Sequence, residues 1–243
     1  MPATCRALAT GTLMLVLCGC ATSATQTIAT GDNDPYEATN RKIFALNQSL
    51  DKNVARPIAV FYNRVVPEFA RDGIHNFLVN LSVPVTFAND VLQGEAKRGV
   101  DTFGRFVVNS TVGIGGLIDV AQKTGIPEHS ADFGETLAVY GVGEGPYLVL
   151  PTLGPSNPRD ALGYGVDIAL DPTTWITFRS SMFFKLGRGF LTIIDERARN
   201  IDTLDQLERS SVDLYATERS LYRQHREAEI NHGKPNIENL PNF

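Results

Sequence analysis

Side chains that could act as nucleophiles or general bases occur in this chain, but none stands in a recognised catalytic spacing. Ser110 and Ser156 could attack an ester, yet neither lies in a GxSxG turn and no base is indicated beside either. The chain also has no HExxH pair, no Walker loop and no EF-hand loop. We therefore predict that it is not an enzyme and holds no metal or cofactor. The scattered histidines are interpreted as structural or surface residues: His75, His129, His225 and His232.

The amino terminus carries a different chemistry, centred on one cysteine. A basic start is followed by a mostly apolar run over residues 7–17, which is typical of an export signal. About eleven residues are too few to cross a bilayer, which takes about twenty. The sequence Leu17-Cys18-Gly19-Cys20 resembles the bacterial lipobox, in which the cysteine thiol receives a diacylglyceryl group before cleavage in front of it. Ala21, rather than Asp, then favours delivery to the outer membrane.

This motif predicts a signal peptide over residues 1–19, lipidation of Cys20 and an acylated tether over 20–33. Cys5 and Cys18 leave with the signal, so the mature chain has no disulfide and no free thiol. Loss of Arg6 changes the net charge from −5 to −6, which argues against nucleic acid as a partner. About 220 residues remain, enough for one large domain, and no apolar run among them approaches a conventional membrane span.

Repeated Asx-Pro and Val-Pro pairs predict where helices begin. Asp34, Pro35 and Glu37 match the N-cap, N1 and N3 positions of a first helix, which Arg56-Pro57 should interrupt or bend. The other predicted helix starts are Val66-Pro67, Val83-Pro84 with an end near Gly94, Asn157-Pro158 and Asp171-Pro172.

The second half of the sequence indicates one long helix and little β-sheet. A single helix is expected over residues 201–230, because Leu207, Leu214 and Leu221 recur every seven residues. The most strand-like run is Leu137–Leu150, and residues 233–243 should form a flexible tail. We predict a mainly α fold with one helical domain over residues 34–232.

Two features leave alternatives open. The glycines at 113–116 and 141–147 indicate either turns with close helix approach or a moving hinge. The short amphipathic helices are also rich in phenylalanine, which forms either an ordinary core or a surface that lies in a membrane. These residues are Phe44, Phe61, Phe69, Phe77, Phe87, Phe103 and Phe106.

A series of short motifs resembles the MlaA (VacJ) lipoproteins, from Asp34 to at least Asn231. Eight motifs in the right order carry the resemblance. They are Asp34-Pro35-x-Glu37-x-x-Asn40-Arg41-x-x-Phe44-x-x-Asn47, Arg56-Pro57, Asn76-Phe77-x-x-Asn80-Leu81, Leu92-Gln93-Gly94, Arg105-Phe106-x-x-Asn109-Ser110-Thr111-x-Gly113, Asp132-Phe133-Gly134-x-Thr136-Leu137, Tyr140-Gly141-Val142-Gly143-x-Gly145-Pro146-Tyr147-x-x-Leu150-Pro151 and Arg159-Asp160.

The resemblance implies a ring-shaped bundle of amphipathic, partly interfacial helices around a central channel, anchored in the outer membrane and facing the periplasm. Such a protein removes mislocalised phospholipids from the outer leaflet and passes them to a periplasmic lipid-carrier protein. It also associates with a trimeric porin and needs no cofactor. The alternative is a structural, porin-associated lipoprotein without transport activity. An envelope lipase using Ser110 or Ser156 is the weakest alternative.

The same resemblance assigns candidate site residues. It makes Gly141, Gly143 and Gly145 the hinge of a channel-side helix. Arg56, Arg105 and Asn109 are polar positions inside otherwise apolar stretches, so we expect them either to line the channel or to form buried polar pairs.

Overall fold

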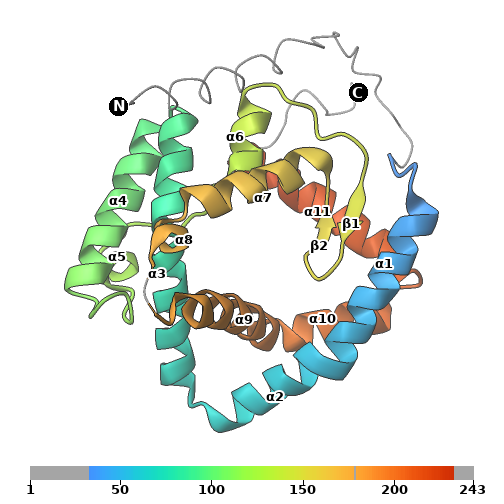
Figure 1. The fold of residues 1–243 in the computed structure, drawn as a ribbon, viewed down its shortest axis with the longest axis horizontal. Coiled ribbons are helices and arrows are strands. Elements are labelled where there is room, and N and C mark those ends of the chain that lie inside the picture. The colour runs from blue at the N-terminus through green and yellow to red at the C-terminus, as the bar shows by residue number, and fades with distance from the viewer. Residues whose placement is uncertain (1–32, 178, 233–243) are drawn as a thin grey trace, which may run out of the picture. The chain divides into compact units, whose positions relative to one another are not determined.

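A computed structural model describes residues 33–177 and 179–232, and the described residues from Asp34 onward belong to one compact unit. The signal peptide, Cys20, most of the tether and the tail at 233–243 lie outside the described residues. The elements of the unit are drawn in Figure 1: α1 Glu37–Leu50, a π-helical segment Asp51–Ala55, α2 Arg56–Val65, α3 Glu68–Leu92, α4 Ala96–Thr111, α5 Val120–Lys123, α6 Phe133–Val139, β1 Leu148–Leu150, β2 Gly154–Ser156, α7 Pro158–Leu170, α8 Pro172–Trp175, α9 Ser181–Arg199, α10 Ile201–Ser210 and α11 Leu214–Ile230.

The mainly α prediction is confirmed, and the strands are confined to one small hairpin in the described residues. In it β1 pairs antiparallel with β2, with Val149 opposite Pro155. Leu137 and its neighbours, which belonged to the most strand-like run, are instead part of α6. Among the described residues, none of the helices combines the length and the apolar character that crossing a bilayer requires.

Local capping signals correctly located several helix starts. The Asn157 side chain accepts a hydrogen bond of 2.8 Å from the backbone N–H of Asp160 at the start of α7. The Asp171 side chain does the same for Thr173 at α8. These caps depend only on residues two or three positions apart, so the sequence is sufficient to predict them.

Asp34 does not cap the first helix, contrary to our prediction. The N-cap of α1 is Tyr36, and no side chain caps it. The Asp34 carboxylate instead accepts hydrogen bonds from Asn40, Tyr215 and Arg219. Buried donors from a distant helix therefore displace the local cap.

The prolines interrupt fewer helices than predicted. At Arg56-Pro57 the chain stays helical, but the π-helical segment Asp51–Ala55 separates α1 from α2, so the regular α-helix is interrupted there as predicted. Pro84 lies inside α3, so the predicted helix start at Val83-Pro84 is wrong. The 25-residue α3 stays continuous because it packs on α4 and α9, and this packing outweighs the loss of one helical hydrogen bond.

The predicted helix over residues 201–230 is also wrong, because the chain breaks between α10 and α11. Ser211 has extended backbone angles, and Asp213 starts α11 by accepting a hydrogen bond from the Ala216 N–H. Leu207 therefore lies on a different helix from Leu214 and Leu221. The buried face of α11 carries Tyr215, Arg219 and Arg226 instead, while Leu221 is exposed.

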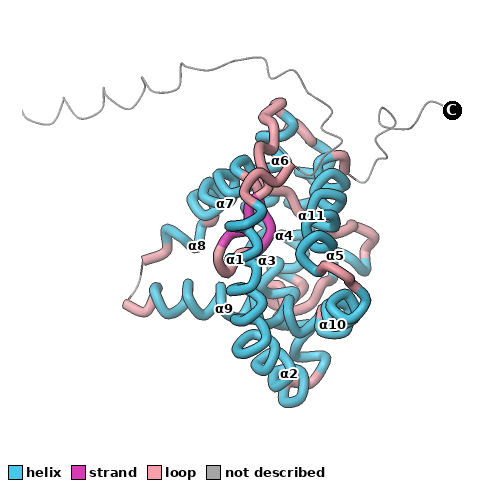
Figure 2. The backbone as a smooth tube through the Cα atoms, turned by 90° about the vertical axis from the view of Figure 1, so that its right-hand side faces the viewer, coloured by secondary structure: helices cyan, strands magenta, loops and turns pink. Residues whose placement is uncertain are grey.

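Helix pairs hold the unit together. The hairpin of α3 and α4, the pair α2 and α9, and the pair α6 and α7 are the principal contacts (Figures 1 and 2). The α6–α7 contact needs glycine on both sides, because a Cβ on Gly163 would lie 2.4 Å from the backbone nitrogen of Gly134. A small aromatic core joins α11 to α1 and the hairpin through Tyr147, Val149 and Tyr215.

Candidate functional site

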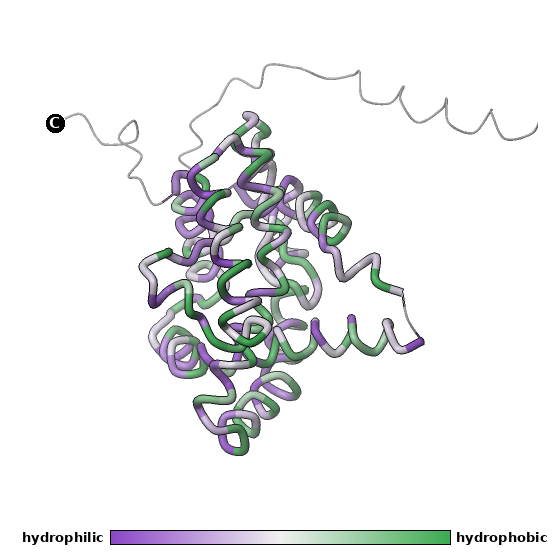
Figure 3. Tube along the Cα trace, turned by 90° about the vertical axis from the view of Figure 1, so that its left-hand side faces the viewer, coloured by the Kyte–Doolittle hydropathy of each residue, from purple (hydrophilic) through white to green (hydrophobic). Residues whose placement is uncertain are grey.

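The described surface is unusually rich in large apolar side chains. Phe69, Val100 and Phe183 are 79%, 72% and 80% exposed. Of the phenylalanines singled out in the sequence, Phe61, Phe69 and Phe103 point outward, whereas the rest are half-buried. Figure 3 shows hydrophobic and hydrophilic residues interleaved along the helices. Large apolar side chains exposed in this number indicate contact with protein or membrane.

The interior is correspondingly polar. Among the described residues 18 polar or charged side chains are buried, against 9 apolar ones. In a water-soluble protein the buried residues are mostly apolar, and buried charges require partners. The buried side chains here are therefore held by hydrogen bonds and ion pairs, while much of the apolar surface faces outward.

Arg226 on α11 is the centre of a largely buried network of charged groups. Its guanidinium donates to Asp132 at 2.6 Å and to Asp160 at 2.8 Å, which joins α11 to the starts of α6 and α7. Burial lowers the pKa of Arg226, but the carboxylates of Asp132 and Asp160 outweigh it and raise that pKa above its usual value. Burial also raises the pKa of Glu135, next to this network, to about 8.

A second buried network centres on Asp34. Burial alone would raise the pKa of its carboxyl, but hydrogen bonds from Tyr215, Asn40 and Arg219 hold it below its usual value. Sequence reasoning missed both networks. Arg219 and Arg226 are seven residues apart, as are Tyr215 and Tyr222, and this spacing was the available signal for a polar buried face.

Arg105 and Asn109, two of the candidate polar residues, lie one helical turn apart on α4 and meet at Asp119. Arg105 donates to Asp119 at 2.7 Å and to the Ile126 carbonyl, and Asn109 donates to Asp119 at 3.0 Å. Burial tends to raise the pKa of Asp119, but these bonds and one from the Gln122 N–H lower it. The three side chains hold the segment after α4 against that helix.

Arg56, the third candidate, is far less buried. It forms a two-pronged ion pair with Asp205, with the shorter contact at 2.6 Å, and so joins α2 to α10. The structure thus brings Arg105 and Asn109 together but leaves Arg56 in a separate contact.

The three hinge candidates lie in the connection from α6 to β1. Gly141 and Gly145 have φ values of 84° and 74°, in the left-handed region that favours glycine. Gly143 does not have a positive φ. Two contacts fix this connection to the rest of the unit. They are the Glu144–Arg223 ion pair at 2.9 Å and the backbone carbonyl of Tyr147, which accepts a hydrogen bond from the Asn40 side chain. In the other glycine-rich segment Gly116 has a φ of 94° and lies against the Asn80 side chain.

Ser110 and Ser156 make structural contacts. Ser110 accepts a hydrogen bond from Asn80 at 3.0 Å, as expected of a buried hydrogen bond, and Ser156 donates to the carbonyl of Asn157. Within residues 33–177 and 179–232 neither serine is hydrogen-bonded to a histidine. His129 pairs with the buried Asp90 at 3.0 Å.

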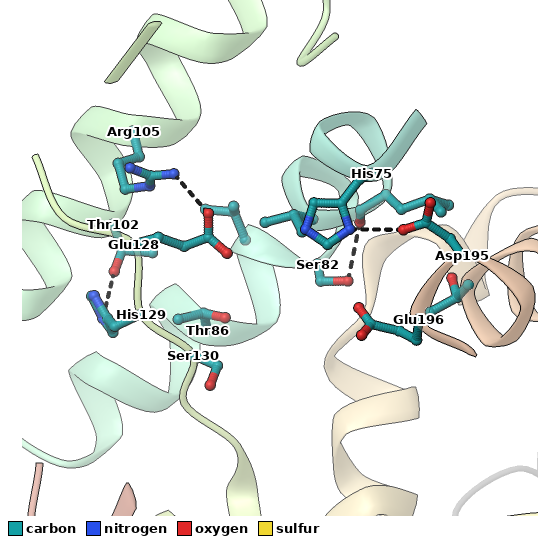
Figure 4. A pocket seen from close by; sticks show the side chains of 14 residues that line it. His75, Ser82, Thr86, Thr102, Arg105, Glu128, His129, Ser130, Asp195 and Glu196 are labelled. Atoms are coloured by element: carbon teal, nitrogen blue, oxygen red, sulfur yellow. Dashed lines mark hydrogen bonds and ion pairs between the residues drawn. The ribbon is translucent and has the colours of Figure 1, made fainter. Parts of the chain in front are cut away.

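Several cavities lie between the helices of the described part of the chain. One of about 200 Å³ lies between α3, α4 and α9, with His75 and Asp195 at one end and Arg105 and His129 at the other (Figure 4). Another of about 540 Å³ is lined by leucines of α10 and α11 together with Arg197 and Glu218. Burial raises the pKa of Glu218. Each of these two cavities therefore combines apolar walls with a few charged groups.

Comparison with known proteins gives a consistent result. Residues 32–229 match the sequence profile described as "MlaA lipoprotein". The chain is 38% identical over 240 residues to the "Intermembrane phospholipid transport system lipoprotein MlaA" of Escherichia coli K12, covering 97% of this chain and 92% of that one. It is 40% identical over 202 residues to an uncharacterized protein of Rickettsia bellii, covering 83% and 78%.

A solved structure gives the same answer for the fold. It is described as "Structural basis for maintenance of bacterial outer membrane lipid asymmetry", and it superimposes with a TM-score of 0.73 at 37% identity. The match covers 82% of this chain and 99% of that one. With identity spread over nearly the whole chain and the same arrangement of helices, this protein belongs to the MlaA lipoprotein family.

Proposed function

We propose that this protein is an outer-membrane lipoprotein that removes mislocalised phospholipids from the outer leaflet and so maintains lipid asymmetry. Membership of the MlaA family and the likeness to its phospholipid-transport members support this function. The observation that carries it is the outward apolar surface on helices that are too short or too polar to span a bilayer. Such helices fit a body that lies within one leaflet. The protein is not an enzyme.

The anchor places this body at its membrane. Acylation of Cys20 holds the chain at the inner leaflet of the outer membrane, and the segment 20–33 links the anchor to the start of the helical unit. Several acyl chains on one residue give firm attachment, whereas a single chain gives only marginal binding. The anchor thus supplies location and the helical unit supplies activity.

The route for lipid is a central channel within a ring of amphipathic helices. A phospholipid headgroup cannot enter hydrocarbon cheaply, because burying an unpaired charge is costly. A path lined by both polar and apolar groups lowers that cost while the acyl chains stay in apolar surroundings. The cavity bounded by the leucines of α10 and α11, with Arg197 and Glu218 in its wall, has this mixed character.

Two partners complete the proposal. A trimeric porin holds the body in the membrane, and a soluble periplasmic carrier takes the lipid onward. Since no bond is made or broken, the transfer needs no cofactor.

Deletion and complementation test the proposal. A clean deletion should raise the amount of phospholipid exposed on the cell surface and the sensitivity to detergent with chelator, and the wild-type gene should reverse both. If outer-leaflet lipid is the same with and without the protein, it does not perform this transport.

The competing function is a structural lipoprotein that stabilises a porin without moving lipid. Gly143 separates the two, because it lacks a positive φ and a Cβ there would meet nothing within 4 Å. Gly143→Ala should therefore act as wild type, whereas Gly143→Pro fixes the backbone at the proposed hinge. We expect the proline variant to lose lipid movement in vesicles while it keeps porin association. Loss of porin association with unchanged lipid movement would favour the structural function.

A further inference from the structure

Three side chains of metal-binding type from two helices meet at one end of the cavity shown in Figure 4. His75 on α3 has its Nδ1 2.8 Å from an Asp195 carboxylate oxygen on α9, and Glu196 follows Asp195 on the same helix. One ligand atom from each of the three lies within 4.8 Å of the others. No spacing in the sequence indicates this group, because 120 residues separate His75 from Asp195.

The negative charge of this group is only partly neutralised by its neighbours, which favours binding of a cation. Asp195 is 1% exposed, and its carboxylate accepts hydrogen bonds from Arg199 at 3.2 Å and from the Tyr62 hydroxyl at 3.3 Å, besides its contact with His75. Arg199 offsets one negative charge. The exposed Glu196 carboxylate has no hydrogen bond or ion pair within the described part of the chain, so its charge is not offset there.

We propose that His75, Asp195 and Glu196 bind one Zn²⁺ ion. Zinc takes histidine nitrogen and carboxylate oxygen at about 2.0–2.2 Å, which sets two ligands of a tetrahedral ion about 3.3 Å apart. The His75–Asp195 contact of 2.8 Å needs to open slightly, and Glu196, which is exposed, can rotate inward. The adjoining cavity of about 200 Å³ has space for a water as the fourth ligand.

The donor set favours zinc over the harder divalent cations. Calcium and magnesium prefer sites made entirely of oxygen, whereas an imidazole nitrogen suits zinc and its neighbours in the transition series. The ion would cross-link α3 to α9. Because it binds only the folded arrangement, it would stabilise the protein in proportion to the logarithm of zinc concentration. This site is independent of phospholipid transport.

Equilibrium dialysis of the detergent-purified lipoprotein against Zn²⁺, without a polyhistidine tag, tests the site. We expect one zinc ion per chain, and we expect His75→Asn and Glu196→Gln each to weaken binding at least about tenfold. The matched control is His225→Asn, because His225 also pairs with a carboxylate, Glu229 at 3.2 Å, but has no third metal-binding side chain near it among the described residues. The control should bind zinc as the wild type does.

Thermal unfolding gives a second readout. At the same zinc concentration, the melting temperature should rise clearly less in Glu196→Gln, whose exposed side chain is not needed for folding, than in the wild type and in His225→Asn. If His75→Asn fails to fold, Glu196→Gln decides the test. The absence of saturable zinc binding, unchanged binding in Glu196→Gln, or equal displacement by Mg²⁺ overturns the proposal.

Discussion

Replacing Glu135 by Gln removes a carboxyl that the fold keeps neutral. Glu135 is 1% exposed, and its Oε2 has no hydrogen-bond partner in the described part of the chain. Burial, aided by the charge of Asp132, raises its pKa from 4.5 to about 8. Arg226 lies 3.5 Å from Glu135 but makes a shorter contact of 2.6 Å with Asp132, so it offsets the effect of burial only in part.

The direction and size of the effect follow from these two pKa values. A group whose pKa is raised on folding contributes stability that is complete below the unfolded pKa of 4.5 and is lost as the pH rises through about 8. Each pH unit in this window costs about 1.4 kcal/mol, which gives an upper limit of about 5 kcal/mol. Since Gln cannot ionise, Glu135→Gln should gain stability relative to the wild type across the window.

Urea unfolding of the detergent-solubilised protein, followed by circular dichroism at several pH values, measures this difference. The matched control is Glu227→Gln, which makes the same substitution on the exposed face of α11 and should give a difference that hardly changes with pH. A constant difference between Glu135→Gln and the wild type, from about pH 5 to about pH 8, refutes the reasoning, because Glu135 is then ionised in the folded protein.

Three further predictions concern packing, charge and the anchor. Gly163→Ala should destabilise the protein by about 1–3 kcal/mol or more, because the added Cβ meets the backbone of Gly134. Gly165→Ala should instead stabilise α7 by roughly 0.5–1 kcal/mol, because a Cβ there meets nothing within 4 Å. The melting temperatures of the two variants measure both effects. Arg226→Met should cost about 1.5–3 kcal/mol in urea unfolding, because Asp132 and Asp160 lose charge-assisted hydrogen bonds from Arg226, while Asp160 keeps its ion pair with Arg159. Cys20→Ala should leave the circular dichroism spectrum unchanged but move the protein from the membrane to the soluble fraction, as cell fractionation would detect.

The sequence alone was sufficient wherever the cause was local. Asn157 and Asp171 begin helices because each side chain reaches an amide only two or three residues further on. The mainly α fold follows from many such local signals. The motif series was sufficient to place the chain in its family, because the order of short motifs is a property of the sequence alone. The lipobox at Cys20 is equally local, although it lies outside the described residues.

The tertiary structure decided what each polar side chain does. Asp34 has the position of a helix cap, but Arg219, 185 residues away, provides a stronger partner for its carboxylate. The Val83-Pro84 pair predicts a helix start, yet α3 continues through Pro84 because α3 packs against neighbouring helices. The buried charges of α11 and the meeting of His75 with Asp195 also depend on contacts over long sequence distances. The seven-residue spacing on α11 marks a buried face but not its partners, since the energy of these contacts exists only once the helices have packed.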